Sequence, residues 1–388
     1  MIERRNVVSL AMAVVTLTLG RLYSQGKSPS LADLAARARA DSNDPVAFYE
    51  LAAALVKNRH YREADRPLRE ALRIDPQYAP ALLLLSEVNE SQYAPLLAMM
   101  RGRRILFVRL DPRADETSLL RRRAFLIDPL VEVGTPSRDL LPVAWRGTLG
   151  QALRAYDEER WSEAAAGFQT VIDRTLRPTD STKVPPVALW FRARCALKIG
   201  DYDGAIRYLE WLLALRMQDS VTERRWNPFV GEELRYVLAY VHQQAGRWDE
   251  AISRYQELLE LDLGLDAAHS HLAEIYGAEG RWTDAVDERV RAIQANPQAT
   301  SLYFNLGATL TAAGRYDEAI ASLKSYVAVY PRESRAVYLV GVAYMGLGNA
   351  DSARTAFSRF LALTPTRYTE QIADAKRRLD TLAPVERR

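Results

Sequence analysis

The sequence is poor in the residues that build disulfide frameworks and metal sites. Only one cysteine, Cys195, and four histidines occur among its 388 residues. A single cysteine cannot form an intramolecular disulfide, so stability has to come from packing, and Cys195 is expected as a small buried hydrophobe. His269 and His271 are two positions apart, which on a helix turns their side chains about 200° from each other. We therefore expect no metal and no cofactor.

Sequence motifs of enzymes are also missing. The chain has no nucleophile elbow, no glycine loop that could cradle a phosphate, no Cys-x-x-Cys pair and no haem-attachment sequence. These absences predict a protein that is not an enzyme. A hydrolase hidden in residues 77–141 is a remote alternative, because that segment contains neither histidine nor cysteine.

A strong excess of charge of one sign is missing as well. The formal net charge is +3, from 52 basic and 49 acidic residues, so nucleic acid is not expected as a partner. One local cluster of arginines within residues 101–123 is the exception, and it could contact anionic lipid or an acidic protein, or simply form a solvated face. The cluster comprises Arg101, Arg103, Arg104, Arg109, Arg113, Arg121, Arg122 and Arg123.

The N-terminus has the features of an export signal. Arg4 and Arg5 precede an apolar run over residues 7–19, as in the charged and hydrophobic regions of a signal peptide. As a helix this run spans about 20 Å, less than the roughly 30 Å hydrocarbon core of a bilayer. We expect cleavage after Gly26, with Gly20 as a second candidate, and a periplasmic or secreted protein. An uncleaved anchor in the inner membrane is the alternative.

An internal repeat is the dominant feature of the chain. Four glycines recur at intervals of 34 residues, and around each the same residue types return, with a small residue seven positions before the glycine and an alanine five positions after it. The glycines are Gly246, Gly280, Gly314 and Gly348; the small residues are Ala239, Ala273, Gly307 and Gly341; the alanines are Ala251, Ala285, Ala319 and Ala353.

This spacing predicts a pair of antiparallel helices in each repeat. The turn glycine allows a positive φ at the end of the first helix. The small residue and the alanine are expected to face each other so that the two backbones approach closely. Prolines that follow the second helix, Pro297, Pro331 and Pro365, separate one repeat from the next. Because each hairpin cannot bury both of its apolar faces alone, neighbouring hairpins should stack.

The residues Leu306-Gly307, Tyr316, Asp317-Glu318-Ala319 and Pro331 resemble the signature of the tetratricopeptide repeat. The resemblance implies an all-α fold, a right-handed α-solenoid with a concave groove. Earlier copies extend the array to roughly eight repeats. One copy surrounds Gly200; another spans Leu149 to Phe168, with Leu149-Gly150 in the frame and a slightly long turn; a third has Arg59 in place of the turn glycine.

Six segments follow from this reading. They are a signal peptide over 1–26, an N-terminal helix and first repeat over 27–76, a degraded repeat or irregular insertion over 77–141, two repeats with inserted loops over 142–231, four consecutive repeats over 232–365, and a capping helix with a tail over 366–388. Within the degraded segment, residues 79–88 could form a first helix, whereas residues 104–110 fit a strand or a helix equally well.

By the same resemblance, a stripe on the first helix of each repeat lines the groove. These positions carry aromatic rings and a few polar groups, a mixture that binding surfaces favour, and Asn305 resembles the groove asparagine that contacts the ligand backbone in peptide-binding members. The alternative, that the rings only pack against adjacent repeats, stays open. The groove candidates are Trp190, Phe191, Arg194, Tyr236, Tyr240, Gln243, His271, Glu274, Phe304, Asn305 and Tyr338.

We therefore predict an exported scaffold that binds a protein or an extended peptide, as an assembly factor of the cell envelope. The alternative is a structural subunit of an envelope complex that uses the arginine-rich segment 77–141 as its interface. Membrane contact, if any, would involve an uncleaved N-terminus or the basic residues of 101–123.

Overall fold

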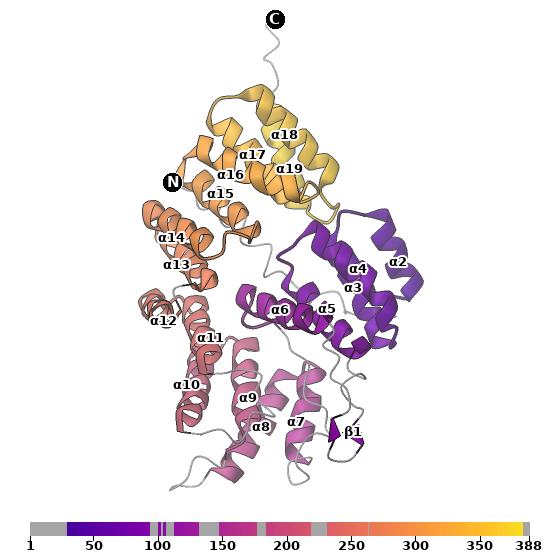
Figure 1. Cartoon of the computed structure of the whole chain (residues 1–388), viewed down its shortest axis with the longest axis vertical. Coiled ribbons are helices and arrows are strands. Elements are labelled where there is room, and N and C mark those ends of the chain that lie inside the picture. Colours follow the sequence, from indigo (N-terminus) through magenta and orange to yellow (C-terminus); the bar gives the residue numbers. More distant parts are fainter. Residues whose placement is uncertain are drawn as a thin grey trace, which may run out of the picture. The chain divides into compact units, whose positions relative to one another are not determined.

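The computed structural model describes residues 29–93, 100–101, 104–105, 112–131, 147–176, 184–218, 231–262 and 264–382. Within these ranges the protein is all-α, with eighteen helices and one two-stranded ribbon (Figure 1). The expected fold class is therefore confirmed. The signal peptide predicted for residues 1–26 lies outside the described residues, and among those described no helix is long and apolar enough to cross a membrane.

The described residues of the N-terminal part form five helices and two short strands. They are α2 (Leu31–Ala40), α3 (Pro45–Lys57), α4 (Tyr61–Ile74), α5 (Ala79–Tyr93), β1 (Met100–Arg101), β2 (Arg104–Ile105) and α6 (Pro112–Ile127). The strands pair antiparallel, with Met100 opposite Ile105.

The remainder consists of helices only, in the part of it that is described. They are α7 (Thr148–Asp157), α8 (Trp161–Thr175), α9 (Pro186–Lys198), α10 (Tyr202–Gln218), α11 (Gly231–Gln244), α12 (Trp248–Leu261), α13 (Asp266–Ala278), α14 (Trp282–Ala295), α15 (Ser301–Ala313), α16 (Tyr316–Val329), α17 (Ser334–Gly346), α18 (Ala350–Leu363) and α19 (Thr369–Thr381).

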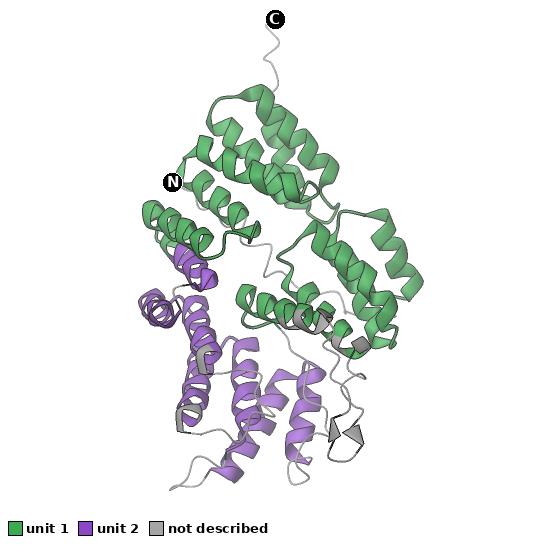
Figure 2. Cartoon of the chain, viewed as in Figure 1, with its two compact units in different colours: residues 1–131, 276–388 green, residues 132–275 purple. Residues whose placement is uncertain are grey.

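The chain divides into two compact units (Figure 2). The first unit joins residues 1–131 to residues 276–388, and the second comprises residues 132–275. The first unit therefore brings together segments from the two ends of the chain. In the second unit, α7 packs on α8, α9 on α10 and α11 on α12, and each pair also contacts the next.

Left-handed backbone at the turn reverses the chain in each hairpin. Five turn glycines have φ between 72° and 81°, namely Gly200, Gly246, Gly280, Gly314 and Gly348. Arg59 (φ 64°) and Glu159 (φ 58°) adopt the same conformation without glycine. Glu159 precedes Trp161 by two residues, and four of the five turn glycines precede an aromatic residue by the same interval, Gly348 being the exception. The prediction of a long turn in this copy is therefore wrong. The turn has the ordinary length, with Glu159 in the place of the turn glycine.

The close approach of the two helices differs in detail from expectation. A Cβ atom on Gly307 would lie 2.5 Å from Cγ of Leu323, and one on Gly341 would lie 2.9 Å from Cε1 of Phe357. The small residue before the turn therefore faces a large side chain of the second helix, and not the alanine. In the copy with Glu159, Ala152 is the small residue at this place, since it touches Gly167, and Gly150 is not.

The alanines after the turns serve the contact between repeats. Ala319 is fully buried in a cluster that includes Leu310 of its own repeat and Ala343 of the next. The aromatic residue before it also reaches forward, because the ring of Tyr316 lies against Gly346. Stacking of consecutive hairpins thus buries the faces that one hairpin leaves open.

Residues 77–141 contain more regular structure than the sequence indicated. α5 begins at Ala79 and packs against α6, and the pair buries Leu82, Leu83 and Ala124. Residues 104–105 form a strand, which answers the question left open for that short part. At the other end of the chain, α19 packs on α18 and buries only Ala375, which suits a terminal helix.

Two chemically distinctive side chains belong to the core of the second unit. Cys195 is fully buried, and burial raises the pKa of its thiol to about 11, so the thiolate that would react is scarce at neutral pH. His242 is 5% exposed, and neither ring nitrogen has a hydrogen-bond partner among the described residues.

We predict opposite stability effects at two turns of the same conformation. Gly314→Ala should lower the free energy of unfolding by about 1 kcal/mol, because a Cβ atom disfavours the left-handed region. Arg59→Gly should raise it by about 0.5 kcal/mol for the converse reason. Urea unfolding followed by circular dichroism measures both changes. A destabilised Arg59→Gly variant would contradict this account of the turn.

His242 should make folding sensitive to acid. Burial, aided by Arg254, lowers the pKa of its imidazole below the usual value of 6.5. Below about pH 6.5 the unfolded chain therefore binds a proton that the folded chain does not bind. As the pH falls, the free energy of unfolding decreases by up to about 1.4 kcal/mol per pH unit. His242→Leu should flatten the unfolding profile between about pH 7 and pH 5. An equally steep profile in this variant would show that other groups cause the loss.

Candidate functional site

The predicted groove stripe separates into buried and partly exposed positions. The rings ten residues before the turn glycine are all buried, with exposures of 7% for Trp190, 2% for Tyr236, 6% for Phe304 and 7% for Tyr338. Three of them pack against an aromatic residue of their own second helix: Tyr236 on Tyr255, Phe304 on Tyr326, and Tyr338 on Phe357 and Phe360. At this position the rings form a packing layer.

The candidates on α9 belong to this layer too. Phe191 lies between two rings of the preceding repeat, edge-on to Tyr156 at 5.0 Å and stacked on Phe168 at 5.7 Å. Arg194 is 4% exposed and donates from Nε to the Tyr156 hydroxyl over 2.8 Å, with its guanidinium over the Trp190 ring. Phe191 and Arg194 thus join α9 to α7 and α8.

Three candidates on α11 and α13 meet Tyr255 of α12 in one cluster. The buried His271 imidazole is stacked on Tyr255, with ring centroids 5.3 Å apart, and meets Tyr236 and Tyr240 edge-on at 5.6 and 5.3 Å. Tyr255 is not among the residues predicted from the sequence. It lies nine residues after the turn glycine, where the other repeats also carry a large side chain. His271 therefore fills the space between the rings itself.

A chain of hydrogen bonds leads from this cluster to the surface. The fully buried Tyr255 hydroxyl donates to Gln243 Oε1 over 2.9 Å, and Gln243 Nε2 donates to Glu274 Oε2 over 3.1 Å. His271 Nδ1 lies 3.1 Å from the same carboxylate oxygen. Burial raises the pKa of Tyr255, so its hydroxyl keeps its proton. The Glu274 side chain is 23% exposed, and Tyr240 and Gln243 are also partly exposed.

Phe304 and Asn305 are neighbours with different roles. Phe304 lies in the core, with the Arg335 guanidinium 5.4 Å from its ring centroid. Asn305 is partly exposed, and its side-chain amide makes no hydrogen bond within the part of the chain that is described. An amide that offers a donor and an acceptor to solvent is suited to bind a peptide backbone.

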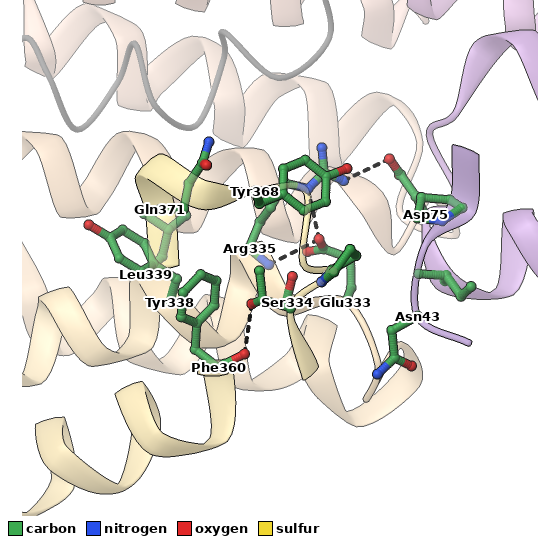
Figure 3. A pocket seen from close by; sticks show the side chains of 14 residues that line it. Asn43, Asp75, Glu333, Ser334, Arg335, Tyr338, Leu339, Phe360, Tyr368 and Gln371 are labelled. Carbon is green, nitrogen blue, oxygen red and sulfur yellow. Dashed lines mark hydrogen bonds and ion pairs between the residues drawn. The ribbon is translucent and has the colours of Figure 1, made fainter. Parts of the chain in front are cut away.

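Tyr338 lines a pocket within the first unit (Figure 3). Its hydroxyl donates to Asp374 of α19, which Arg378 also contacts at 2.6 Å. Burial alone would raise the pKa of Asp374, but these hydrogen bonds outweigh it and lower that pKa. The enclosed volume is about 50 Å³, which suits a few water molecules and is far below the roughly 300 Å³ of a small-molecule site.

The polar wall of this pocket joins distant parts of the sequence. Arg335 Nη2 lies 3.0 Å from Asp75 Oδ2, and its Nε lies 2.7 Å from Glu333 Oε1 (Figure 3). Burial would lower the pKa of Arg335, but the two carboxylates outweigh it and raise that pKa, so the guanidinium is charged. No motif in the sequence pointed to this group, because Asp75 and Arg335 are 260 positions apart.

Metal binding and the basic cluster are two further possibilities on which the described residues bear. No group of three or more histidine, cysteine, aspartate or glutamate side chains in the described ranges could hold a metal ion. Of the basic cluster, Arg121, Arg122 and Arg123 are exposed on α6, while Arg103 and Arg109 lie outside the described residues.

Comparison with known proteins identifies the repeat. The sequence profile of the tetratricopeptide repeat matches residues 149–220, 236–300, 270–331 and 304–368, which together exceed half of the chain. The comparison with curated proteins found no match.

Several solved structures are similar to part of this chain at low sequence identity. A crystal structure of MamA protein is 23% identical, with a TM-score of 0.38, and the match covers 49% of this chain and 94% of that one. MamA from Desulfovibrio magneticus RS-1 is 16% identical, with a TM-score of 0.37 and coverages of 44% and 90%. The C-terminal part of a tetratricopeptide-repeat protein from Cytophaga hutchinsonii is 13% identical, with a TM-score of 0.46 and coverages of 60% and 92%. On the strength of the profile match, this chain belongs to the tetratricopeptide repeat family.

Proposed function

We propose that the protein is an exported scaffold that binds a segment of another protein on the first helices of its repeats, without catalysing a reaction. Tetratricopeptide repeats are protein-interaction modules, and the array from residue 149 to residue 368 supplies their framework. The partner is a component of the cell envelope, and binding serves its assembly.

The observation that carries this proposal is the partial exposure of polar groups above the buried ring layer. Tyr240, Gln243 and Glu274 offer an aromatic edge, an amide and a carboxylate within one connected network. Asn305 offers an amide that has no hydrogen bond of its own in the described part of the chain. Such groups orient a ligand, while the buried rings beneath them keep the surface rigid.

Export rests on the N-terminal sequence. Arg4 and Arg5 before the apolar residues 7–19 are typical of a signal peptide, and the single cysteine is compatible with an oxidising compartment because it has no partner to pair with. An uncleaved anchor would also place the repeats on the periplasmic side of the inner membrane.

Replacement of the exposed groove residues should abolish partner capture. We expect the chain from Lys27 onward to retain a partner from envelope extract, and a Tyr240→Ala, Glu274→Gln, Asn305→Ala variant to retain about tenfold less, because such contacts dominate interface energies. Quantitative mass spectrometry of the retained proteins measures the difference.

The matched control is a Gln256→Ala, Lys324→Ala variant, whose changes lie at exposed positions of the second helices α12 and α16. It should retain the partner as the native chain does, with equal helicity in all three proteins. If the groove variant binds normally while the control loses the partner, the binding surface lies on the second helices and the proposal fails.

Export can be tested on the full-length chain. We expect the protein in the periplasmic fraction with Lys27 as its N-terminal residue, determined by mass spectrometry of the purified protein. An Arg4→Glu, Arg5→Glu variant should accumulate unprocessed, because the positive n-region is lost. An intact N-terminus on a membrane-bound protein would indicate the anchor instead, and a processed variant would contradict the signal.

A further inference from the structure

Within the first unit, loops of the first repeat contact loops of the last two repeats through opposite charges. Four carboxylates lie on the first repeat and three arginines on the last two, and they meet along the edge where successive repeats are joined. The carboxylates are Asp41, Asp44, Glu70 and Asp75, and the arginines are Arg332, Arg335 and Arg367.

Arg332 makes the densest set of these contacts. It lies in the loop between α16 and α17, and its Nε donates to Asn43 Oδ1 over 2.7 Å. It also donates to the Ser42 carbonyl, and its Nη1 lies 3.6 Å from Glu70 Oε2. One guanidinium thus contacts both the loop before α3 and the second helix of the first repeat.

The loop between α18 and α19 makes a second set. Arg367 Nη2 lies 2.8 Å from Asp44 Oδ1, and the Thr366 backbone N–H donates to Asp41 Oδ2 over 3.0 Å. Asp44 is 6% exposed, and burial raises the pKa of its carboxyl against the influence of Arg367. The loop between α18 and α19 thus holds two carboxylates, Asp41 and Asp44, that are three residues apart. The pair of Arg335 and Asp75 is a third contact between the same repeats.

The contact between the first repeat and the last two repeats is of a kind that can open and form again. It depends on ion pairs and hydrogen bonds, and the arginines of these pairs keep contact with water, which screens their charges. The arginine side chains keep exposures of 21% for Arg332, 21% for Arg335 and 35% for Arg367. The pocket beside Arg335 leaves about 50 Å³ unfilled. Polar, imperfectly filled contacts within a chain resemble transient interfaces.

We propose that the loop edge formed by Arg332, Arg335 and Arg367 is an acceptor for acidic segments of a partner protein, and that the first repeat is its built-in competitor. The proposal rests on the scaffold function above and adds the chemistry of a partner. Such a segment carries two carboxylates spaced like Asp41 and Asp44, because the Thr366 backbone N–H and the Arg367 guanidinium hold those two. It gains access when the first repeat leaves.

The test begins with a variant in which the competitor is released. Asp44→Asn with Asp75→Asn removes two charges but keeps the oxygens that accept the Val46 and Gln77 backbone N–H groups, so both loops retain their turns. Glu63→Gln with Asp65→Asn is the control, because it changes the charge equally in the same repeat, at the exposed Glu63 and at the partly exposed Asp65, which pairs with Arg69 of its own helix.

The probe is a fluorescein-labelled peptide of residues 31–57, which contains both acceptor-bound aspartates. By fluorescence anisotropy the released variant should bind it at least about tenfold more tightly than the native chain or the control. Adding Arg332→Gln and Arg367→Gln should remove this gain, because these two arginines contact residues 42–44, and a peptide with Asn at positions 41 and 44 should not bind. Equal binding by the native and released chains, or by the two peptides, overturns the proposal.

A distance measurement separates release from unfolding. Spin labels on Lys57→Cys and Asp351→Cys, with Cys195→Ala, should give a narrow distance distribution in the native background and a broader, longer one in the released variant or at 1 M salt. An unchanged distribution would show that these charges do not hold the contact. If the released variant dimerises in sedimentation, the edge accepts a second copy and the assignment to another partner is wrong. These measurements use purified protein, so they stand apart from the failure of any capture experiment.

Discussion

The architecture depends on one constraint, the close approach of two helices beside a left-handed turn. Gly307 against Leu323 and Gly341 against Phe357 leave no room for a Cβ atom. This contact sets the spacing within a hairpin, and the alanine after the turn then admits the next hairpin, as Ala319 does for Ala343. Repetition of the two contacts produces the stacked array.

Much of this framework could be predicted from the sequence, because the constraint is local. A turn that requires positive φ selects glycine, and a fixed hairpin length repeats that glycine every 34 residues. Glu159 escaped notice because the left-handed conformation is tolerated there without glycine. The sequence frame also placed the small residue opposite the wrong partner, since periodicity gives a position along a helix but not the side chain that it meets on the neighbouring helix.

The candidate site was harder to predict for the same reason. Periodicity identified the stripe on the first helices, but it did not separate the buried ring of Tyr236 from the partly exposed Tyr240 four residues later. What covers Tyr236 is Tyr255 on the second helix, and a large side chain at that point of each repeat was a signal within the sequence. The contact of Asp75 with Arg335 had no such signal, because it joins repeats from opposite ends of the chain.

The central claim is that the partly exposed face of the first helices, above the buried rings, is where a partner binds. Hydrogen–deuterium exchange of the mature chain, with and without its captured partner, tests this claim most directly. The account predicts that the partner slows exchange in α11, α13 and α15 and leaves the second helices α12, α14 and α16 unchanged. Protection confined to those second helices, or to α6 with its exposed arginines, would contradict it.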